Sequence, residues 1–114
     1  MIKVYSDYEY RIIHSNEISF MRNPGFPWKG NSEKDFVNFM KQSQQYFKEW
    51  EQTKSNASYK VGNVDFAYVY LDIGRCVCVE RKKNGKYIVA SEGRHRLYVA
   101  KKYKFDILVC VVNS

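Results

Sequence analysis

The expected fold follows from one stretch, Tyr87-Ile88-Val89-Ala90-Ser91-Glu92-Gly93-Arg94-His95-Arg96-Leu97. Tyr87–Ala90 is rich in β-branched and aromatic residues, which favour a strand. Glycine then interrupts the pattern, and Leu97 and Ala100 lie on one side of a run with helical spacing. We therefore predict a strand, a turn at Gly93 and a helix that ends near Lys104.

The flanking sequence predicts two more strands. Arg75–Glu80 alternates with the period of a strand, and Asn84-Gly85 is the strongest short signal for a β-hairpin with residues 87–90. Residues 107–112 form a continuous apolar run, which is typical of a strand buried on both faces. Because a strand, helix and strand in succession favour a parallel crossover, we expect this last strand to run parallel to residues 87–90.

The first half of the chain predicts a short strand, a loop and a long helix. Residues 10–20 alternate loosely, and Asn23-Pro24-Gly25-Phe26-Pro27 cannot continue a regular element. From Ser32 to about Glu51 apolar residues recur every three or four positions, and Ser32 with Asp35 forms a capping box. We expect the apolar stripe of this helix to lie in the core and not to act as a base-stacking platform.

The middle of the chain is less regular. Residues 52–60 are polar and predict a loop, whereas Val64–Ile73 is apolar and is predicted to be extended up to Gly74. With 114 residues and no evident linker, residues 1–114 are expected to form a single domain. The predicted fold class is α+β: a compact mixed α/β domain with a small mixed sheet, a β-hairpin and a C-terminal strand, helix and strand.

Composition narrows the class of protein. Apolar residues make up 45% and aromatics 17% of the chain, too many for a disordered segment, and charges interrupt the apolar runs before they reach membrane-spanning length. The formal charge of +7 attracts phosphates if it is gathered on one face. The N-terminus shows no apolar secretory segment, so we expect a cytoplasmic protein without a membrane partner.

Lysines gather in two clusters near the turn in sequence. We predict that they contact nucleic acid, and the residues concerned are Lys82, Lys83, Lys86, Lys101 and Lys102. The alternative is that both clusters are solvated tips of a hairpin and a helix, because charge runs usually serve solubility.

The three cysteines, Cys76, Cys78 and Cys110, each lie among valines. Their odd number and surroundings predict free thiols that pack in the core of a reduced protein. The Cys-Val-Cys spacing puts two thiols on one face of a strand, which would also suit a metal or a redox pair. No further Cys or His follows at a zinc-ligand spacing, so core packing is the favoured prediction.

We expect the functional site at this turn, because the free N–H groups of a helix N-terminus bind phosphate. Gly93 permits close approach of the backbone, Arg94 and Arg96 can clasp phosphate oxygens, and His95 can donate a hydrogen bond or shuttle a proton. Glu92 can act as a general base or as a metal ligand. We therefore predict a phosphate site at residues 93–96, with Glu92 and His95 as catalytic residues. The alternative is that both arginines are surface charges and His95 a satisfied helix-cap residue.

Residues 87–97, the following Ala100-Lys101-Lys102 and the run at 107–112 resemble the signature segment of the ParB/sulfiredoxin superfamily. Its members place an acidic-Gly-x-His-Arg or Gly-Glu-Arg-Arg turn between a strand and an Ala-rich helix. The resemblance covers mainly residues 75–112. Before them, only a first strand, Asn23-Pro24 and a helix occur in suitable order. The resemblance implies a compact mixed α/β fold whose turn holds the phosphates of a nucleotide, such as ATP, ADP or CTP.

Activities within this superfamily diverge. Its members reduce peroxiredoxin sulfinic acid, hydrolyse CTP on DNA, phosphorylate free serine or act as nucleases. Arg94 stands where sulfiredoxins carry their essential cysteine, which disfavours sulfinic acid reduction. Chromosome partitioning is disfavoured as well, because 114 residues leave no room for a helix-turn-helix domain.

Three classes of function remain. The first is an enzyme acting on phosphates, a nuclease or an ATP- or ADP-dependent phosphotransferase, with Glu92 as base or Mg²⁺ ligand. The second is a non-catalytic DNA- or nucleotide-binding regulator, such as a mobile-element or antidefence factor. The third is a toxin-like effector that a protein partner neutralises. The positive charge favours nucleic acid over a small substrate, and the sequence leaves the oligomeric state open.

Overall fold

The predicted α+β fold class is confirmed by a computed structural model of the chain, which describes residues 2–54 and 59–112. The described residues form a four-stranded mixed sheet, a two-stranded sheet and three α-helices. In chain order the elements are β1 (Glu9–Ile13), the 3-10 helix η1 (Ser15–Glu17), α1 (Glu33–Thr53), β2 (Lys60–Val61), β3 (Val64–Asp65), α2 (Phe66–Tyr70), β4 (Cys78–Arg81), β5 (Tyr87–Val89), α3 (Arg94–Tyr103) and β6 (Ile107–Val111).

The main sheet has the strand order β1-β6-β4-β5. β6 is antiparallel to β1 and parallel to β4, and each of its residues is buried, as expected for a central strand. The prediction that it runs parallel to residues 87–90 was wrong. The hairpin makes β5 antiparallel to β4. On the outer edge of β5, the Tyr87 carbonyl accepts a hydrogen bond from the Ser19 N–H at 2.8 Å. The free edge of β4 therefore accepts the last strand.

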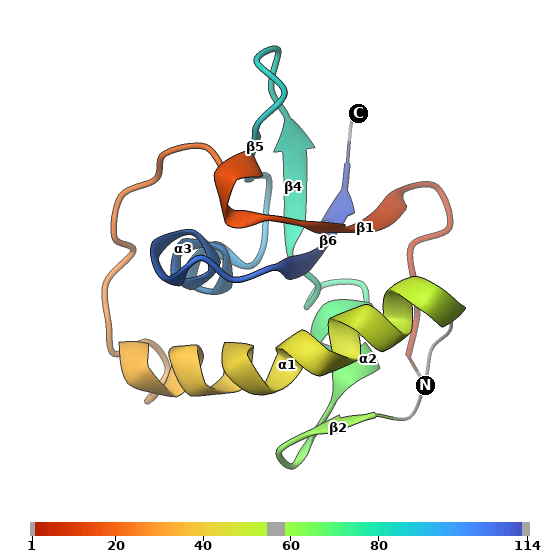
Figure 1. Cartoon of the computed structure of the whole chain (residues 1–114), viewed down its shortest axis with the longest axis horizontal. Coiled ribbons are helices and arrows are strands. Elements are labelled where there is room, and N and C mark those ends of the chain that lie inside the picture. The colour runs from red at the N-terminus through yellow and green to blue at the C-terminus, as the bar shows by residue number, and fades with distance from the viewer. Residues whose placement is uncertain (1, 55–58, 113–114) are drawn as a thin grey trace.

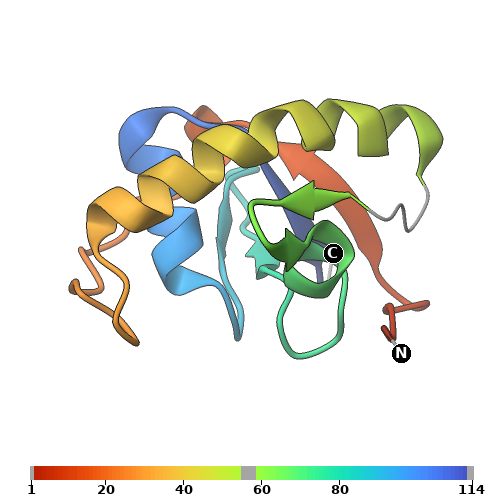
Figure 2. The same cartoon turned by 90° about the horizontal axis from the view of Figure 1, so that it is seen from below.

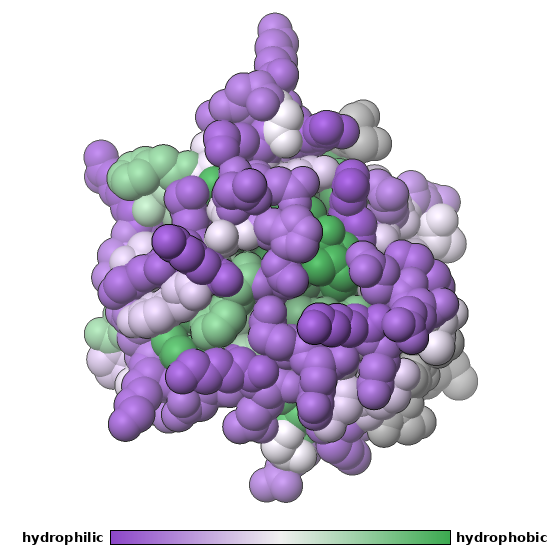
Figure 3. All heavy atoms as spheres, in the orientation of Figure 1, coloured by the Kyte–Doolittle hydropathy of each residue, from purple (hydrophilic) through white to green (hydrophobic). Residues whose placement is uncertain are grey.

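The helices pack around this sheet. α1 crosses the molecule beside α3 and contacts β6 and β1, while α2 and the β2–β3 pair lie at the opposite end from the β4–β5 hairpin (Figures 1 and 2). Hydrophilic side chains cover most of the face in Figure 3, and apolar side chains show in a recess near its centre. Among the described residues, no helix is both long enough and apolar enough to cross a membrane.

The long helix agrees with its prediction. α1 spans Glu33–Thr53, and the Ser32 hydroxyl accepts the Asp35 N–H at 3.1 Å, which completes the capping box. Its apolar stripe lies in the core, as predicted, and the buried residues are Met40, Ser43, Phe47 and Trp50. Of the predicted loop at 52–60, residues 52 and 53 belong to α1 and residue 60 belongs to β2, and residues 55–58 lie outside the described part of the chain.

Residues 64–65 form β3 but residues 66–70 form a helix, so the prediction of an extended segment over Val64–Ile73 was wrong beyond its first two residues. Phe66, Ala67 and Tyr70 are buried, and Tyr70 packs edge-on against Phe47 of α1 with ring centroids 4.9 Å apart. Apolar residues that face solvent, including Tyr68 at 40% exposure, hide this helical period in the sequence. Packing against α1 therefore decides the local structure.

The predicted hairpin and C-terminal helix are confirmed. The turn after β4 closes with the Lys82 N–H donating to the Lys86 carbonyl at 2.7 Å, and Gly85 has a φ of +84°. α3 spans Arg94–Tyr103 and begins after Gly93, whose φ is +97°. A Cβ at Gly93 would lie 2.7 Å from Cγ2 of Val77, so this glycine is required by packing as well as by backbone conformation.

The predicted free and buried state of Cys76, Cys78 and Cys110 is also confirmed. Cys78 pairs with Cys110 across β4 and β6, and the sulfurs of Cys76 and Cys78 are 3.7 Å apart. Tyr5 and Tyr10 pack against this cluster. The thiols act as small apolar groups at one end of the sheet.

Replacing Gly93 by Ala should destabilise the domain by about 2–5 kcal/mol, because strain at positive φ adds to the clash with Val77. Gly85→Ala is the matched control: its φ is also positive, but nothing lies within 4 Å of the added Cβ. It should cost only about 1–2 kcal/mol. Urea unfolding of both variants measures the difference, and equal losses would contradict the packing argument.

Candidate functional site

The predicted turn borders a groove with a volume of about 530 Å³. Residues 92–96 form one side of it, the start of α1 and the loop at residues 28–31 form a second, and the α2 region with Gly74 and Arg75 forms a third. The elements are far apart in sequence and meet here because Gly93 lets the start of α3 pack against Val77, immediately before β4. The five residues predicted around the turn therefore share one concave site.

Arg94 and Glu92 are the groups of the turn that remain available to a ligand. Arg94 is the first residue of α3 and is exposed, and its guanidinium forms no hydrogen bond or ion pair with another described residue. Glu92 is partly exposed, and its carboxylate is likewise without such a partner in the described chain. Hydrogen bonding within α3 begins with the Leu97 N–H on the Gly93 carbonyl at 2.9 Å. The N–H groups before it lack an acceptor within the helix.

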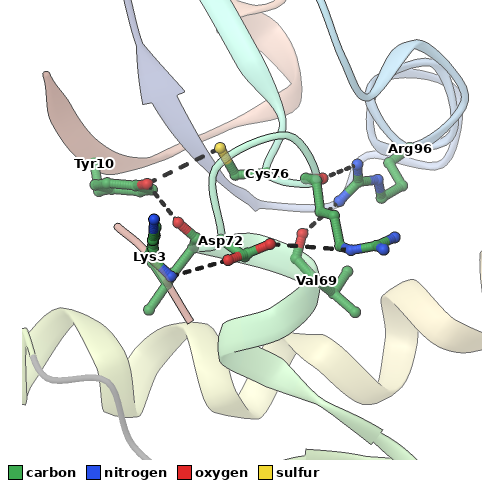
Figure 4. Close-up of polar contacts among 8 residues, drawn as sticks. Lys3, Tyr10, Val69, Asp72, Cys76 and Arg96 are labelled. Atoms are coloured by element: carbon green, nitrogen blue, oxygen red, sulfur yellow. Dashed lines mark hydrogen bonds and ion pairs between the residues drawn. The ribbon is translucent and has the colours of Figure 1, made fainter. Parts of the chain in front are cut away.

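The side chain of Arg96 stabilises the fold by binding backbone carbonyls. Its guanidinium donates to the carbonyls of Val69 in α2, at 2.9 Å, and of Arg75, at 2.5 Å, and so joins α3 to α2 and to the segment that follows it (Figure 4). Tyr10 holds the same segment from its other side by donating to the carbonyl of Leu71 at 2.5 Å. Burial lowers the pKa of Arg96, although a guanidinium stays charged at any physiological pH.

His95 is the centre of an aromatic cluster. Its ring stacks on Trp28, with centroids 4.6 Å apart, and on Phe36, while Phe26 meets it edge-on. The carbonyl of Gly25 lies 3.1 Å from Nε2, and since a carbonyl only accepts, Nε2 carries the proton. Burial lowers the pKa of His95, which favours this neutral form. His95 thereby holds the loop at residues 25–31 against α3.

The sequence analysis did not predict two cation–π pairs that the structure contains. The guanidinium of Arg75 lies 4.2 Å from the ring centroid of Tyr68, and the ammonium of Lys29 lies 4.6 Å from that of Trp28. Both pairs line the groove, and Trp28 is 37% exposed. Trp28 and Lys29 are adjacent in a loop that cannot form a regular element, and this adjacency could have indicated their contact from the sequence. No sequence pattern indicates that Tyr68 contacts Arg75, because this contact depends on the formation of α2.

The five predicted nucleic-acid lysines do not line this groove. Lys82 and Lys83 are exposed in the hairpin, which projects away from α1 (Figure 1). The other three are held by the protein: Lys86 donates to the Asn16 carbonyl and Lys101 to the Ile18 carbonyl, both at 2.7 Å, and Lys102 pairs with Glu33 at 2.6 Å. The structure thus separates the lysine clusters from the turn.

Besides His95, Glu92 and Cys78 are the potential metal-binding or reactive side chains nearest the turn in the described chain. The described residues contain no group of three or more His, Cys, Asp or Glu side chains that could hold a metal ion. A Mg²⁺ ion at Glu92 would take its remaining oxygen ligands from phosphate and water. Cys78 lies directly behind the turn, where its N–H donates to the Glu92 carbonyl at 3.0 Å. The contact with the Cys76 thiol lowers the pKa of Cys78, but the side chain of Cys78 is buried.

Comparisons of the chain with models of known protein families, with curated proteins and with solved structures gave no match. The ParB/sulfiredoxin resemblance therefore rests on the sequence motifs within residues 75–112.

The two histidines should give opposite pH dependences of stability. Burial lowers the pKa of His95, so its contribution is present above the unfolded value of about 6.5 and is lost as the pH falls. The hydrogen bond to Asp106 raises the pKa of His14, so its contribution is present below that value and is lost as the pH rises.

Urea unfolding between about pH 5 and pH 8 tests this expectation on His14→Gln and His95→Gln. Relative to the unchanged protein, His14→Gln should lose stability on acidification, and His95→Gln should gain it. Comparing the variants cancels the shared titration of carboxylates. Parallel curves for the two variants would contradict the assignment.

Proposed function

We propose that this domain binds a nucleotide, such as ATP, ADP or CTP, or the backbone of a nucleic acid, in the groove at the N-terminus of α3. The observation that carries the proposal is Arg94, an unpaired cation on the first turn of a helix that faces a groove with aromatic walls. The helix end and the guanidinium favour the same ligand, because both attract anionic oxygens.

The composition of the groove supports a nucleotide over inorganic phosphate. Its volume of about 530 Å³ lies within the usual range of small-molecule sites. Lys29 and Arg75 add positive charge from two other elements, and each lies over an aromatic ring that a base could stack on in its place. Phosphates would lie toward Arg94, and the base toward Trp28 or Tyr68.

The resemblance to the ParB/sulfiredoxin superfamily supports the same class of ligand. The strand, Gly turn and helix of that family correspond here to β5, Gly93 and α3. The family arginine corresponds to Arg96, whose bonds to two carbonyls leave Arg94 as the freer contact. Three reduced thiols are in keeping with a protein that acts in the cytoplasm.

Catalysis in this groove would depend on Glu92. A nuclease or a phosphotransferase requires a base or a bound Mg²⁺ beside the phosphate, and Glu92 is the carboxylate of the turn. Arg94 would then stabilise the charge of the transition state. A non-catalytic binding module is the second candidate, and it is favoured by the neutral His95, whose Nε2 proton is committed to a backbone carbonyl.

Arg94→Ala should weaken binding of ATP, CTP or a short DNA by about 1.5–3 kcal/mol, the scale of a charge-assisted hydrogen bond. Lys83→Ala is the control, because Lys83 is exposed on the hairpin and contributes only screened attraction. Titrations at two salt concentrations measure both variants. Equal losses would indicate a diffuse basic surface and no specific phosphate site. Arg96→Ala is a poorer test, since it also removes bonds that hold the fold.

Glu92→Gln separates the enzyme from the binding module. In an enzyme the variant should lose turnover of nucleotide or DNA while its affinity stays within about threefold, because a neutral amide cannot act as the base. Product formation and equilibrium binding are measured on the same preparation. An active wild-type protein whose Glu92→Gln variant keeps full turnover would remove Glu92 from the mechanism.

A further inference from the structure

Phe20 is the most exposed of the large apolar side chains in the described chain, at 82%. It borders a shallow cavity of about 350 Å³ whose other lining residues are Met21, Arg22, Asn23, Tyr98, Lys101 and Lys102. Lys101 and Lys102 are held by the Ile18 carbonyl and by Glu33, so Arg22 is the cation of this lining that has no bond to a described residue. An aromatic ring presented to solvent beside the exposed Arg22 suits a ligand that combines flat apolar faces with negative charge.

This cavity and the groove at the turn lie along the same helix. Arg94 and Tyr98 are four positions apart on α3, as are Tyr98 and Lys102, so these side chains share one helix face. The rise between Arg94 and Lys102 is about 12 Å, which corresponds to three or four stacked nucleotides of one strand.

The loop before α1 joins the two sites from the other side. It passes around the outer side of α3 (Figure 1), and contributes residues 20–23 to the cavity and residues 28–31 to the groove. Between them Phe26 packs against both His95 and Tyr98, with ring centroids 5.3 Å and 6.1 Å away. The two sites are therefore the ends of one continuous surface.

Resting on the proposed function, we propose that the ligand is a single-stranded nucleic acid, with a phosphate at Arg94 and a base several nucleotides away stacked on Phe20. A single strand exposes the faces of its bases, whereas a duplex buries them in its own stack. Arg22, which has no ion pair with a described residue, would contact a phosphate beside the stacked base. An acidic peptide would match the charge but not the flat, exposed ring.

The test compares a labelled oligonucleotide of about 8 nucleotides, DNA or RNA, with the corresponding mononucleotide. Phe20→Ala should weaken oligonucleotide binding about tenfold and leave mononucleotide binding unchanged, because only the longer ligand reaches Phe20. Phe20→Trp should retain the affinity. Ile73→Ala is the matched control, since Ile73 is also exposed, at 42%, and lines neither site. Arg22→Ala should reduce the salt dependence by about one counterion.

The outcomes separate this inference from the proposed function. Mononucleotide binding that depends on Arg94, with no loss on Phe20→Ala for the oligonucleotide, overturns the strand path and leaves the groove. Oligonucleotide binding that depends on Phe20 but not on Arg94 supports the stacking site and removes the groove. Tighter binding of a duplex, or of an acidic peptide, than of the single strand overturns the inference.

Discussion

The contact between Gly93 and Val77 is the constraint on which the site depends. A Cβ at Gly93 would lie within 3 Å of three atoms of Val77, including its Cα, so the chain can come this close to the start of β4 only without a side chain. This approach fixes where α3 begins and how its first turn faces the α2 region. The groove, its helix end and the carbonyl bonds of Arg96 all follow from that placement.

Within the turn, structural and ligand-facing tasks are divided between neighbouring residues. Arg96 and His95 donate to backbone carbonyls, and each holds one wall of the groove: Arg96 holds α2 and the segment after it, and His95 holds the loop before α1. Arg94 and Glu92 lie beside them without such bonds in the described chain. Residues that look equivalent in a short motif therefore differ in what they could offer a ligand, because a guanidinium already bonded to carbonyls has fewer free donors.

Elements with a clear period could be predicted from sequence, and those decided by neighbours could not. The capping box at Ser32 and the helical spacing up to Trp50 are local signals, and so is the glycine between β5 and α3. The helix α2 was not predicted because Tyr68 and other solvent-facing apolar residues obscure the helical spacing of its buried residues. The prediction that β6 runs parallel to β5 was wrong because the outer edge of β5 is already bonded to Ser19, which is far from β5 in the sequence.

The sequence by itself determined the α+β class, the long helix, the hairpin, the buried thiols and the location of a candidate phosphate-binding turn, since each depends on residues near one another in the chain. Only the tertiary structure decided that Trp28, Tyr68 and Arg75 meet the turn, that Arg96 binds carbonyls, and that Phe20 lies beside α3. These relations arise when α1, α2 and α3 pack on one sheet, and a side chain's free hydrogen-bonding capacity is set by what that packing brings next to it.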